Sequence, residues 1–482
     1  MANQNFSIVI LAAGKSTRFK SERSKLIHTL AGRPLGDYVA SAALTAGPET
    51  VLMVVGHNAK AVRVTLARPG LKFVEQKDQR GTGHALMVAR PQLEKCKGSA
   101  VVVVVGDAPL LRAETLRDLV ASHQKARAAA SVLTMRPESP RGYGRIVRSS
   151  GSRVRAIVEE KLCTASQRRI REVSSGILCF SRTELLDHLD KLSDRNAQKE
   201  YLLTDLVKIF NQRRKKVVAF PVEDAREVLG VNDRVDLARM ERILRIQKTE
   251  ALMRDGVTIV DPQTTYIDAG VEVGADTIIE PGVSLLGNTR IGRGCTIRVH
   301  STIEDSILSD RVQVRSNTVV NGCEIGSDVI LGPFARLRDG AVIEPDARIG
   351  NFVEVKKSRV GRGSRAWHLT YLGDAALGEQ VNIGAGTVTC NYDGEKKNTT
   401  RIEDGVFVGS GSMLVAPVKV GKGSYVAAGS AITEDVPPES LAVGRARQVN
   451  KEGWVRKQKQ RKSQLKQANS LRKNGAQSGS KS

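Results

Sequence analysis

The sequence has few aromatic residues, few cysteines and no long apolar run. Aromatic residues make up 4% of the 482 residues. No apolar run approaches the ~18 to 20 residues that a transmembrane helix needs, which argues against a membrane span. The six cysteines contain no Cys-x-x-Cys pair, so we expect neither a zinc site nor a disulfide framework. Scattered cysteines of this kind fit a reducing compartment, and we expect a cytoplasmic protein.

The N-terminal segment also lacks the features of a signal peptide. Met1–Asn5 contains no basic residue, and the apolar run that follows ends in a glycine loop. We therefore interpret this run as the first strand of a domain.

Positive charge is the feature that the sequence has in excess. The formal net charge is +24, and the segment from Ala446 to Ser482 holds eleven Lys or Arg residues against one acidic residue. This tail is also rich in Gln, Ser, Asn and Gly, so we expect it to be disordered. The remaining excess suits anionic substrates such as phosphates. Nucleic-acid binding through the tail is an alternative, but no aromatic stacking pattern or binding motif accompanies it.

The second half of the sequence repeats itself every six residues, from Ile267 to about Val436. An amphipathic helix needs apolar spacings of three and four, and an ordinary strand needs alternation, so a period of six indicates short strands stacked as a parallel β-helix. Chance spacing in a β-rich domain is the alternative, and three phased blocks argue against it. The aliphatic positions are Ile267, Val273, Ile279, Leu285, Ile291, Ile297 and Ile303, then Ile325, Leu331, Leu337, Ile343, Ile349 and Val355, then Ile402, Val408, Leu414, Val420, Val426 and Ile432.

The first half alternates strand-like and helix-like runs, which indicates a mainly parallel α/β sheet. Residues 7–11, 51–55 and 100–105 are buried strands by composition, and residues 112–121 form one of the helical runs. We expect four parts: an α/β domain over 1–232, a charged linker helix over 233–254, the β-helix over 255–445 and the basic tail over 446–482.

A phosphate-binding loop follows the first strand. Small residues in Leu11–Arg18 let backbone N–H groups approach phosphate oxygens, and Lys15, Arg18 and Lys25 add positive charge. The loop is not a Walker A motif. Asp107 ends a run of valines, at the strand edge where open parallel sheets bind ligands. Since phosphoryl-type transfer needs a divalent cation, Asp107 is a candidate Mg²⁺ ligand, although an arbitrary strand-end Asp is more often a helix cap.

The loop resembles the L-A-A-G-x-x-[ST]-R signature of sugar-phosphate nucleotidyltransferases, and Gln76 and Gly81–Ala85 match the positions that read a nucleobase in that family. From about residue 6 to residue 445 the chain resembles the bifunctional enzymes that acetylate glucosamine 1-phosphate and then uridylylate N-acetylglucosamine 1-phosphate. The resemblance implies that Arg18 assists uridylyl transfer and that Asp107 and Asn232 bind Mg²⁺. The residues that it assigns to UTP are Leu11, Ala12, Ala13, Gly14, Lys25, Gln76, Gly81 and Thr82.

The resemblance also assigns Gly144 and Glu159 to the sugar, and one neighbouring position departs from the family pattern. The family shows E-[VI]-N-[ST]-G, whereas this chain has Ser174 in place of the Asn. A hydroxyl is shorter than an amide and cannot make the same contacts. We therefore expect Ser174 to weaken the binding of the sugar.

A second candidate site surrounds His368, one of two histidines after residue 250. Most lone histidines are structural, but His368 interrupts the aliphatic register, and imidazole suits a base that accepts a proton from an attacking amine near neutral pH. The resemblance implies that role. It places Arg338, Lys356, Tyr371, Asn382 and Lys397 around glucosamine 1-phosphate, and Ala385, Asn391, Tyr392, Ser410, Ala428 and Arg445 along acetyl-CoA.

Two further features bear on this second site. Without the resemblance, Arg338 and Lys356 would be interpreted as exposed solvated charges. Trp367 stands where the family has a small residue, so the packing beside His368 is expected to differ.

These observations predict a bifunctional enzyme that consumes acetyl-CoA and UTP with Mg²⁺ and makes UDP-N-acetylglucosamine. The resemblance further implies a left-handed coil and a homotrimer, with no obligatory nucleic-acid or membrane partner. One rival hypothesis is an enzyme with a single activity, whose β-helix is only an assembly scaffold. Another is a binding protein that uses the basic tail on nucleic acid or on an acidic membrane.

Overall fold

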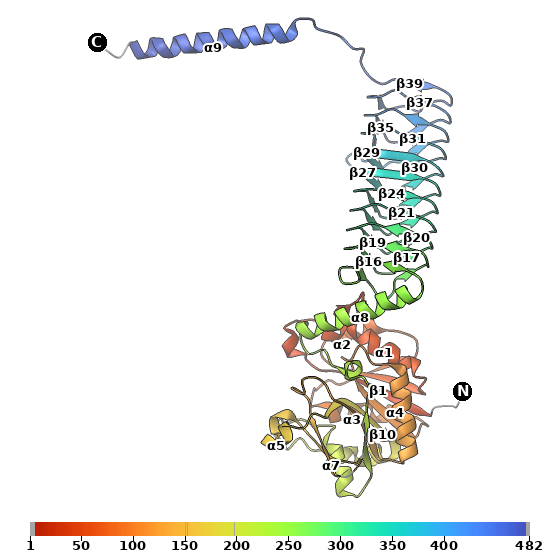
Figure 1. The fold of residues 1–482 in the computed structure, drawn as a ribbon, viewed down its shortest axis with the longest axis vertical. Coiled ribbons are helices and arrows are strands. Elements are labelled where there is room, and N and C mark those ends of the chain that lie inside the picture. The colour runs from red at the N-terminus through yellow and green to blue at the C-terminus, as the bar shows by residue number, and fades with distance from the viewer. Residues whose placement is uncertain (1–4, 150, 152, 197, 479–482) are drawn as a thin grey trace. The chain divides into compact units, whose positions relative to one another are not determined.

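A computed structural model describes residues 5–149, 151, 153–196 and 198–478 of the chain, with side chains up to residue 470. The chain forms two compact units, residues 1–352 and residues 353–482. Figure 1 shows the order of the helices and strands along the chain. In the described residues no helix is long and apolar enough to cross a membrane.

The first unit begins with a mixed sheet that is mainly parallel, as predicted. Strand β10 (Val173–Ser181) is antiparallel to both of its central neighbours, β6 and β7, whereas the pairs β1–β4, β1–β6, β4–β5 and β7–β11 are parallel. The central order is β11-β7-β10-β6-β1-β4-β5. The other bounds are β1 (Phe6–Ala12), β4 (Thr50–Val55), β5 (Leu71–Glu75), β6 (Ala100–Val105), β7 (Ala130–Met135) and β11 (Val217–Pro221).

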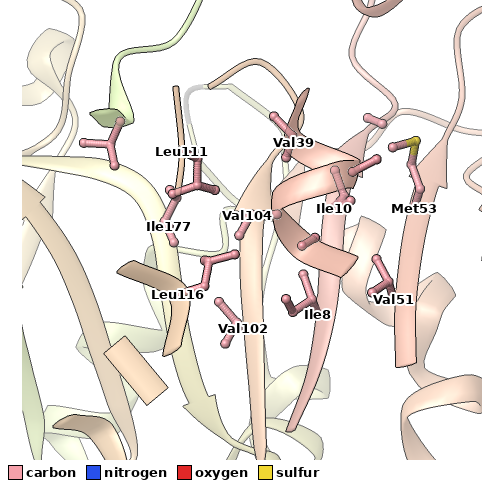
Figure 2. Close-up of a cluster of buried hydrophobic side chains, with 14 of the residues drawn as sticks. Ile8, Ile10, Val39, Val51, Met53, Val102, Val104, Leu111, Leu116 and Ile177 are labelled. Carbon is pink, nitrogen blue, oxygen red and sulfur yellow. The ribbon is translucent and has the colours of Figure 1, made fainter. Parts of the chain in front are cut away.

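Helices cover both faces of this sheet because alternate strand residues point to opposite sides. Figure 2 shows Ile8, Ile10 and Val104 in the cluster that receives Val39 and Leu116 from helices α1 and α4. The intervening residues pack against helices α3, α6 and α7 on the other face. The helices are α1 (Leu35–Thr45), α2 (Ala59–Leu66), α3 (Thr82–Glu94), α4 (Ala113–Ala126), α5 (Ala165–Arg168), α6 (Arg182–His188), α7 (Asp205–Gln212) and α8 (Arg234–Arg254).

Helix α8 occupies the segment where the linker helix was predicted. The carboxylate of Asp233 accepts hydrogen bonds from the backbone N–H groups of Val235 and Asp236, which fixes the beginning of the helix.

The first unit continues as a parallel β-helix. Thr296 pairs with Ile278 on one side and with Gln313 on the other, so one turn takes 18 or 17 residues, which is three six-residue repeats. The repeating aliphatic residues point inward and are buried, with Val273 half-buried. The strands are β12 (Thr258–Ile259), β13 (Tyr266–Ile267), β14 (Glu272–Val273), β15 (Ile278–Ile279), β16 (Ser284–Leu286), β17 (Arg290–Ile291), β18 (Thr296–Ile297), β19 (Thr302–Glu304), β20 (Ile307–Leu308), β21 (Gln313–Val314), β22 (Val319–Asn321), β23 (Glu324–Ile325), β24 (Ile330–Leu331), β25 (Arg336–Arg338) and β26 (Val342–Ile343).

Glycines that follow an aliphatic residue allow neighbouring turns to approach closely. A Cβ on Gly274 would lie 2.8 Å from the backbone carbonyl carbon of Gly292 in the next turn, which is too close for any side chain. At the corners of the β-helix the chain turns through residues with positive φ, among them Asp276, Asn317 and Asp328. Asn and Asp tolerate this conformation better than other residues with a Cβ.

The second unit is also built from parallel strands, and its third aliphatic block is buried throughout. Phe407 pairs with Tyr425, and Tyr425 pairs with Leu441, in successive turns. The strands are β28 (Arg359–Val360), β29 (Arg365–Gly373), β30 (Ala375–Leu377), β31 (Asn382–Ile383), β32 (Val388–Cys390), β33 (Thr400–Ile402), β34 (Phe407–Val408), β35 (Met413–Val415), β36 (Val418–Val420), β37 (Tyr425–Val426), β38 (Ala431–Ile432) and β39 (Leu441–Ala442), and β27 (Arg348–Lys356) ends in this unit.

The tail differs from its prediction. It was expected to be disordered, but Trp454–Ser478 form a helix, α9. Gln, Lys, Arg, Ala and Leu dominate this segment, and these residues favour a helix even where nothing packs against it. The low apolar content of this segment predicts that it does not pack into a hydrophobic core. The side chains of α9 up to residue 470 are almost all exposed.

Candidate active sites

A cleft of about 560 Å³ opens at the carboxyl ends of β1 and β6. All eight residues that the sequence assigned to UTP line it, together with Arg18 and Asp107. The lining residues are Leu11, Ala12, Ala13, Gly14, Lys15, Ser16, Thr17, Arg18, Lys25, Leu26, Gln76, Gln79, Gly81, Thr82, Ala85, Val105, Gly106, Asp107 and Glu200.

The loop after β1 presents its backbone to this cleft. It is anchored at its base, where the Gly106 N–H donates to the Leu11 carbonyl at 2.9 Å and the His57 N–H donates to the Ala13 carbonyl at 3.3 Å. A Cβ on Gly14 would meet no atom within 4 Å, so packing does not require glycine there. Its lack of a side chain instead leaves the backbone open to a ligand in the cleft.

Two cations and two oxygen donors meet on one side of the cleft. The Lys25 ammonium forms an ion pair with the Asp107 carboxylate and also donates to the Val231 carbonyl at 3.0 Å. The Arg18 guanidinium donates to Oδ1 of Asn232 at 2.7 Å. The Val231 N–H donates to the Asp107 carbonyl at 2.9 Å, which brings the segment before α8 beside the end of β6.

This donor set fits Mg²⁺. The metal prefers oxygen ligands and is commonly held by one or two carboxylates together with substrate phosphates and water. Asp107 and Asn232 supply a carboxylate and an amide oxygen, and each of these oxygens already faces a positively charged side chain. No cluster of three or more His, Cys, Asp or Glu residues is found in the described residues. The donor set therefore suits a metal shared with phosphates.

The end of the cleft assigned to the base is built by the beginning of α3. The buried Gln76 amide donates to the Gly81 carbonyl at 3.1 Å and lies 3.0 Å from Nδ1 of His84. Thr82 accepts a hydrogen bond from the Leu203 N–H at 3.0 Å. These contacts fix Gln76 and the backbone of Gly81, and an amide and a backbone are the groups that can read the polar edge of a base.

The three residues assigned to the sugar lie together. The Ser174 N–H donates to the Gly144 carbonyl at 2.8 Å, and a Cβ on Gly144 would lie 3.6 Å from Oε1 of Glu159. Burial, and then the nearby Asp205, raise the pKa of Glu159. Gly176, two residues after Ser174, lies beside the cleft, because a Cβ on Gly176 would lie 3.0 Å from Val105, which lines it.

Sequence reasoning missed several residues at or near this site. Leu26, Gln79 and Glu200 line the cleft, and Tyr143 lies near Asp107. Burial is the main cause that raises the pKa of Tyr143. Gln79 stands between the two recognised segments at Gln76 and Gly81, which is a usable signal, whereas Glu200 lies in a loop without a motif.

In the second unit, His368 lies at the end of a column of small residues. The Gly386 N–H donates to the Leu369 carbonyl at 2.8 Å, so the corner that contains His368 stacks on the corner that contains Ala385. The Gly411 N–H donates to the Ala385 carbonyl at 2.7 Å, so the corner that contains Ser410 stacks on the corner that contains Ala385.

The column continues with Ala428. The Gly429 N–H donates to the Ser410 carbonyl at 2.8 Å, and the Arg445 guanidinium donates to the Ala428 carbonyl at 2.9 Å. His368, Ala385, Ser410, Ala428 and Arg445 are all exposed. The structure thus arranges the predicted base and four predicted acetyl-CoA residues along one edge.

A protruding loop carries three more predicted residues. Asn391 donates to the Asp374 carboxylate at 2.5 Å, and Tyr392 pairs with Lys397 across the loop. Asp393 organises the turn by accepting hydrogen bonds from the backbone N–H groups of Glu395 and Lys396 and from the side chain of Asn398. These hydrogen bonds, that of Lys396 first, lower the pKa of Asp393 to about 2.

The remaining predicted residues lie on strands of the two units. Tyr371 pairs with Val388, and Asn382 pairs with Arg365 near the start of the strand that carries His368. The carbonyl of Lys356 accepts the Asp374 N–H at 3.1 Å, which links it to the residue that holds Asn391.

Arg338 and Trp367 complete the set. Arg338 belongs to the first unit, where its guanidinium pairs with Asp339 at 2.8 Å. Trp367 is half-buried beside His368.

Models of known families match most of the chain. A MobA-like NTP transferase domain matches residues 8–224, a GMPPB C-terminal domain matches residues 262–390, and six bacterial transferase hexapeptide repeats match residues 399–434. The boundaries agree with the α/β sheet and with the β-helical strands of the structure.

Relatives cover nearly the whole chain. The "Bifunctional protein GlmU" of Koribacter versatilis is 49% identical over 95% of this chain and 98% of the relative. The proteins of the same name from Pelobacter propionicus and Anaeromyxobacter dehalogenans are 48% and 50% identical, over 94% and 95% of this chain and 98% and 94% of the relatives. The chain belongs to the GlmU family.

Family membership confirms the predicted fold class and the predicted function. The fold is an α/β nucleotidyltransferase domain followed by a left-handed β-helix of hexapeptide repeats. The function is uridylyl transfer together with acetyl transfer, in the synthesis of UDP-N-acetylglucosamine.

Proposed function

We propose that uridylyl transfer takes place in the cleft at the carboxyl edge of the first sheet, and that acetyl transfer takes place along the stacked corners of the second unit. The observation that carries the proposal is that the eight residues assigned to UTP, with Arg18 and Asp107, line a single cleft. For the second site, the support is the single edge that holds His368 and four residues assigned to acetyl-CoA.

In the first site, each group has a separate task. Backbone N–H groups of the loop after β1 bind the UTP phosphates, and Gln76 and Gly81 hold the base. An oxygen of the sugar phosphate attacks the α-phosphorus of UTP, so that a new P–O bond forms and the bond to pyrophosphate breaks. Asp107 and Asn232 would hold Mg²⁺, which would supply positive charge where the two anions meet.

Lys25 and Arg18 support this step by exchanging partners. Both cations face the metal-ligand oxygens in the structure. Arriving phosphates offer the two cations anionic partners, and the Asp107 and Asn232 oxygens would then be free to hold a metal ion.

In the second site, His368 accepts the proton of the attacking amine. The nitrogen of glucosamine 1-phosphate attacks the thioester carbonyl, the new amide bond forms, and the C–S bond breaks to release the coenzyme thiol. Lys356 and Lys397 neutralise the sugar phosphate, while Tyr371 and Asn382 orient the sugar. Ala385, Ser410 and Ala428 leave room for acetyl-CoA, and Asn391, Tyr392 and Arg445 contact it.

We propose that the enzyme is a homotrimer. Exposed apolar side chains lie near this edge. Phe407, Tyr425 and Leu441 are in register on strands β34, β37 and β39, and Met413 and Val415 lie on strand β35. Phe407 and Tyr425 stack with ring centroids 5.3 Å apart. Burial of such a face against a second copy would complete a site that is open in one chain. An active monomer in sedimentation would contradict the trimer.

We also propose a cytoplasmic location. The six cysteines all lie in described residues and none forms a disulfide. Five of them are buried, so their reduced state suits a compartment that keeps thiols reduced.

The test of the proposed function supplies glucosamine 1-phosphate, acetyl-CoA, UTP and Mg²⁺ to the purified protein and identifies the products by mass. The proposal expects UDP-N-acetylglucosamine, pyrophosphate and free coenzyme A. Omission of acetyl-CoA must stop formation of that product unless N-acetylglucosamine 1-phosphate is supplied. Omission of Mg²⁺ must stop uridylyl transfer and leave acetyl transfer running. Loss of both reactions without Mg²⁺ would contradict the division of roles.

A further inference from the structure

Helix α9 is the most strongly charged part of the described chain, and neither proposed site uses it. Between Trp454 and Ser470 it carries six basic residues and no acidic residue, and every one of the six is exposed. Within the described residues, none of the six forms an ion pair with a carboxylate. The six are Arg456, Lys457, Lys459, Arg461, Lys462 and Lys466.

We propose that α9 binds the phosphate backbone of duplex DNA without sequence preference. The charge density supports this partner. The six residues span ten helical steps, which is about 15 Å at 1.5 Å per residue, so that one positive charge falls about every 3 Å. Duplex DNA carries one negative charge per ~1.7 Å of its axis. The two charge densities are thus of the same order.

The distribution of the charges around the helix favours a groove over a flat surface. At 3.6 residues per turn, Lys459, Lys462 and Lys466 lie on one side, whereas Lys457 and Arg461 lie on the opposite side. The major groove is ~12 Å wide and admits an α-helix, with phosphates of one strand on each side. Both sides of α9 can then approach phosphates at once.

An anionic membrane fits α9 less well. A helix that lies in a membrane interface needs a continuous apolar face. The exposed apolar residues of α9 up to residue 470 are Trp454, Val455 and Leu465, with Ala468 beside Leu465, and Lys462 lies between Leu465 and Val455 around the helix. Basic residues fill the remaining directions, so a flat surface would leave about half of them without a partner.

Binding of this kind is electrostatic and releases counterions. Sequence-independent complexes have dissociation constants of ~10⁻⁴ to 10⁻⁶ M at physiological salt, and log K falls with log salt at a slope of about −0.9 per phosphate neutralised. Contact with about five phosphates predicts a slope near −4 to −5. The inference does not rest on either proposed site, because α9 lies outside both.

The experiment measures the fluorescence anisotropy of a labelled 25-base-pair duplex with the full-length protein between 50 and 200 mM KCl. The test variant carries Lys457→Gln, Lys459→Gln, Arg461→Gln and Lys462→Gln. The matched control carries Gln460→Ala and Gln464→Ala, which alter the same helix without changing its charge. We expect the control to bind as the parent does. The test variant should lose more than tenfold in affinity at 50 mM KCl, and its slope should fall by about 3 to 4.

Three further readings decide the proposal. Helix content by circular dichroism and both half-reactions should be unchanged in the test variant, which separates failure of this proposal from failure of the proposed function. Parent and test variant binding the duplex equally would overturn it. Tighter binding to vesicles that contain 30% phosphatidylglycerol than to the duplex would also overturn it, in favour of a membrane partner.

Discussion

Ser174 stands where the family resemblance predicts an Asn, beside the proposed uridylyl site. Its side-chain oxygen accepts the Gly176 N–H at 3.2 Å, and the residue is buried. The hydroxyl is therefore engaged in its own turn, whereas an amide at this position would extend beyond that turn. The cost of one lost hydrogen bond to a neutral group is ~0.5 to 1.5 kcal/mol.

This geometry predicts that Ser174→Asn lowers KM for N-acetylglucosamine 1-phosphate about threefold to tenfold, with kcat nearly unchanged. Steady-state kinetics of uridylyl transfer measure the effect. Ser174→Ala is the control and should leave KM within about twofold, because the hydroxyl serves the turn. An unchanged or higher KM in the Asn variant would show that the assignment is wrong.

One carboxylate, that of Asp393, accepts three hydrogen bonds within the loop from Asn391 to Asn398. Because the pKa of Asp393 in the folded loop, about 2, lies below its usual value, the stabilisation that it provides is fully present above about pH 4. It is lost as the pH falls toward 2. The loop therefore keeps its order throughout the neutral range.

We expect Asp393→Asn to raise KM for acetyl-CoA roughly threefold or more at pH 7, since a neutral amide accepts the two backbone hydrogen bonds less strongly. Uridylyl transfer should not change. Glu395→Gln is the matched control, because it removes a neighbouring exposed charge but not the hydrogen bonds of Asp393. Equal effects of the two substitutions on KM would contradict the role of Asp393.

Helix α9 should be dispensable for both reactions. Its described side chains are almost all exposed, so its removal uncovers no core. Truncation after Arg447 should leave both half-reactions within about twofold and the melting temperature within a few degrees. Loss of either activity, with circular dichroism unchanged, would show that the tail belongs to a site.

The elements differ in how well the sequence predicts them. The six-residue period predicts the β-helix because each turn buries one aliphatic residue per face, and the strand and helix runs of the first half appear within a few residues of their predicted bounds. The helical state of α9 was not predicted. The low apolar content of this segment indicates that it does not pack into a hydrophobic core, but it does not determine the backbone conformation. The aliphatic pattern also does not predict the positive φ of Asp276 and Asn317 at the corners of the β-helix.

The candidate sites show the same limit. Gly14, Gln76 and Asp107 were found because motifs mark them, and the structure brings them into one cleft. Glu200 was missed because it enters that cleft from a loop far along the chain, and only the packing of Gly81 against that loop reveals it. Tyr143 is next to Gly144 in the sequence, but its proximity to Asp107 depends on the fold.

At the scale of the whole molecule, we propose that the two reactions use separate groups. Lys25, Asp107 and Asn232 belong to the first unit, and His368 belongs to the second. The central claim is that each site works without the other. It follows that substitutions in one site should affect only one half-reaction.

The most direct test assays each half-reaction with its own substrates in two variants, His368→Ala and Asp107→Asn. Loss of the base should slow acetyl transfer by ~10² to 10⁴-fold and leave uridylyl transfer within about twofold. Asp107→Asn should do the reverse, because a neutral amide neutralises the metal less well. His300→Ala, at the other histidine of the β-helix, is the control and should retain both activities. Acetyl transfer within about threefold of the parent in His368→Ala, or loss of both activities together with a lower melting temperature, would contradict the account.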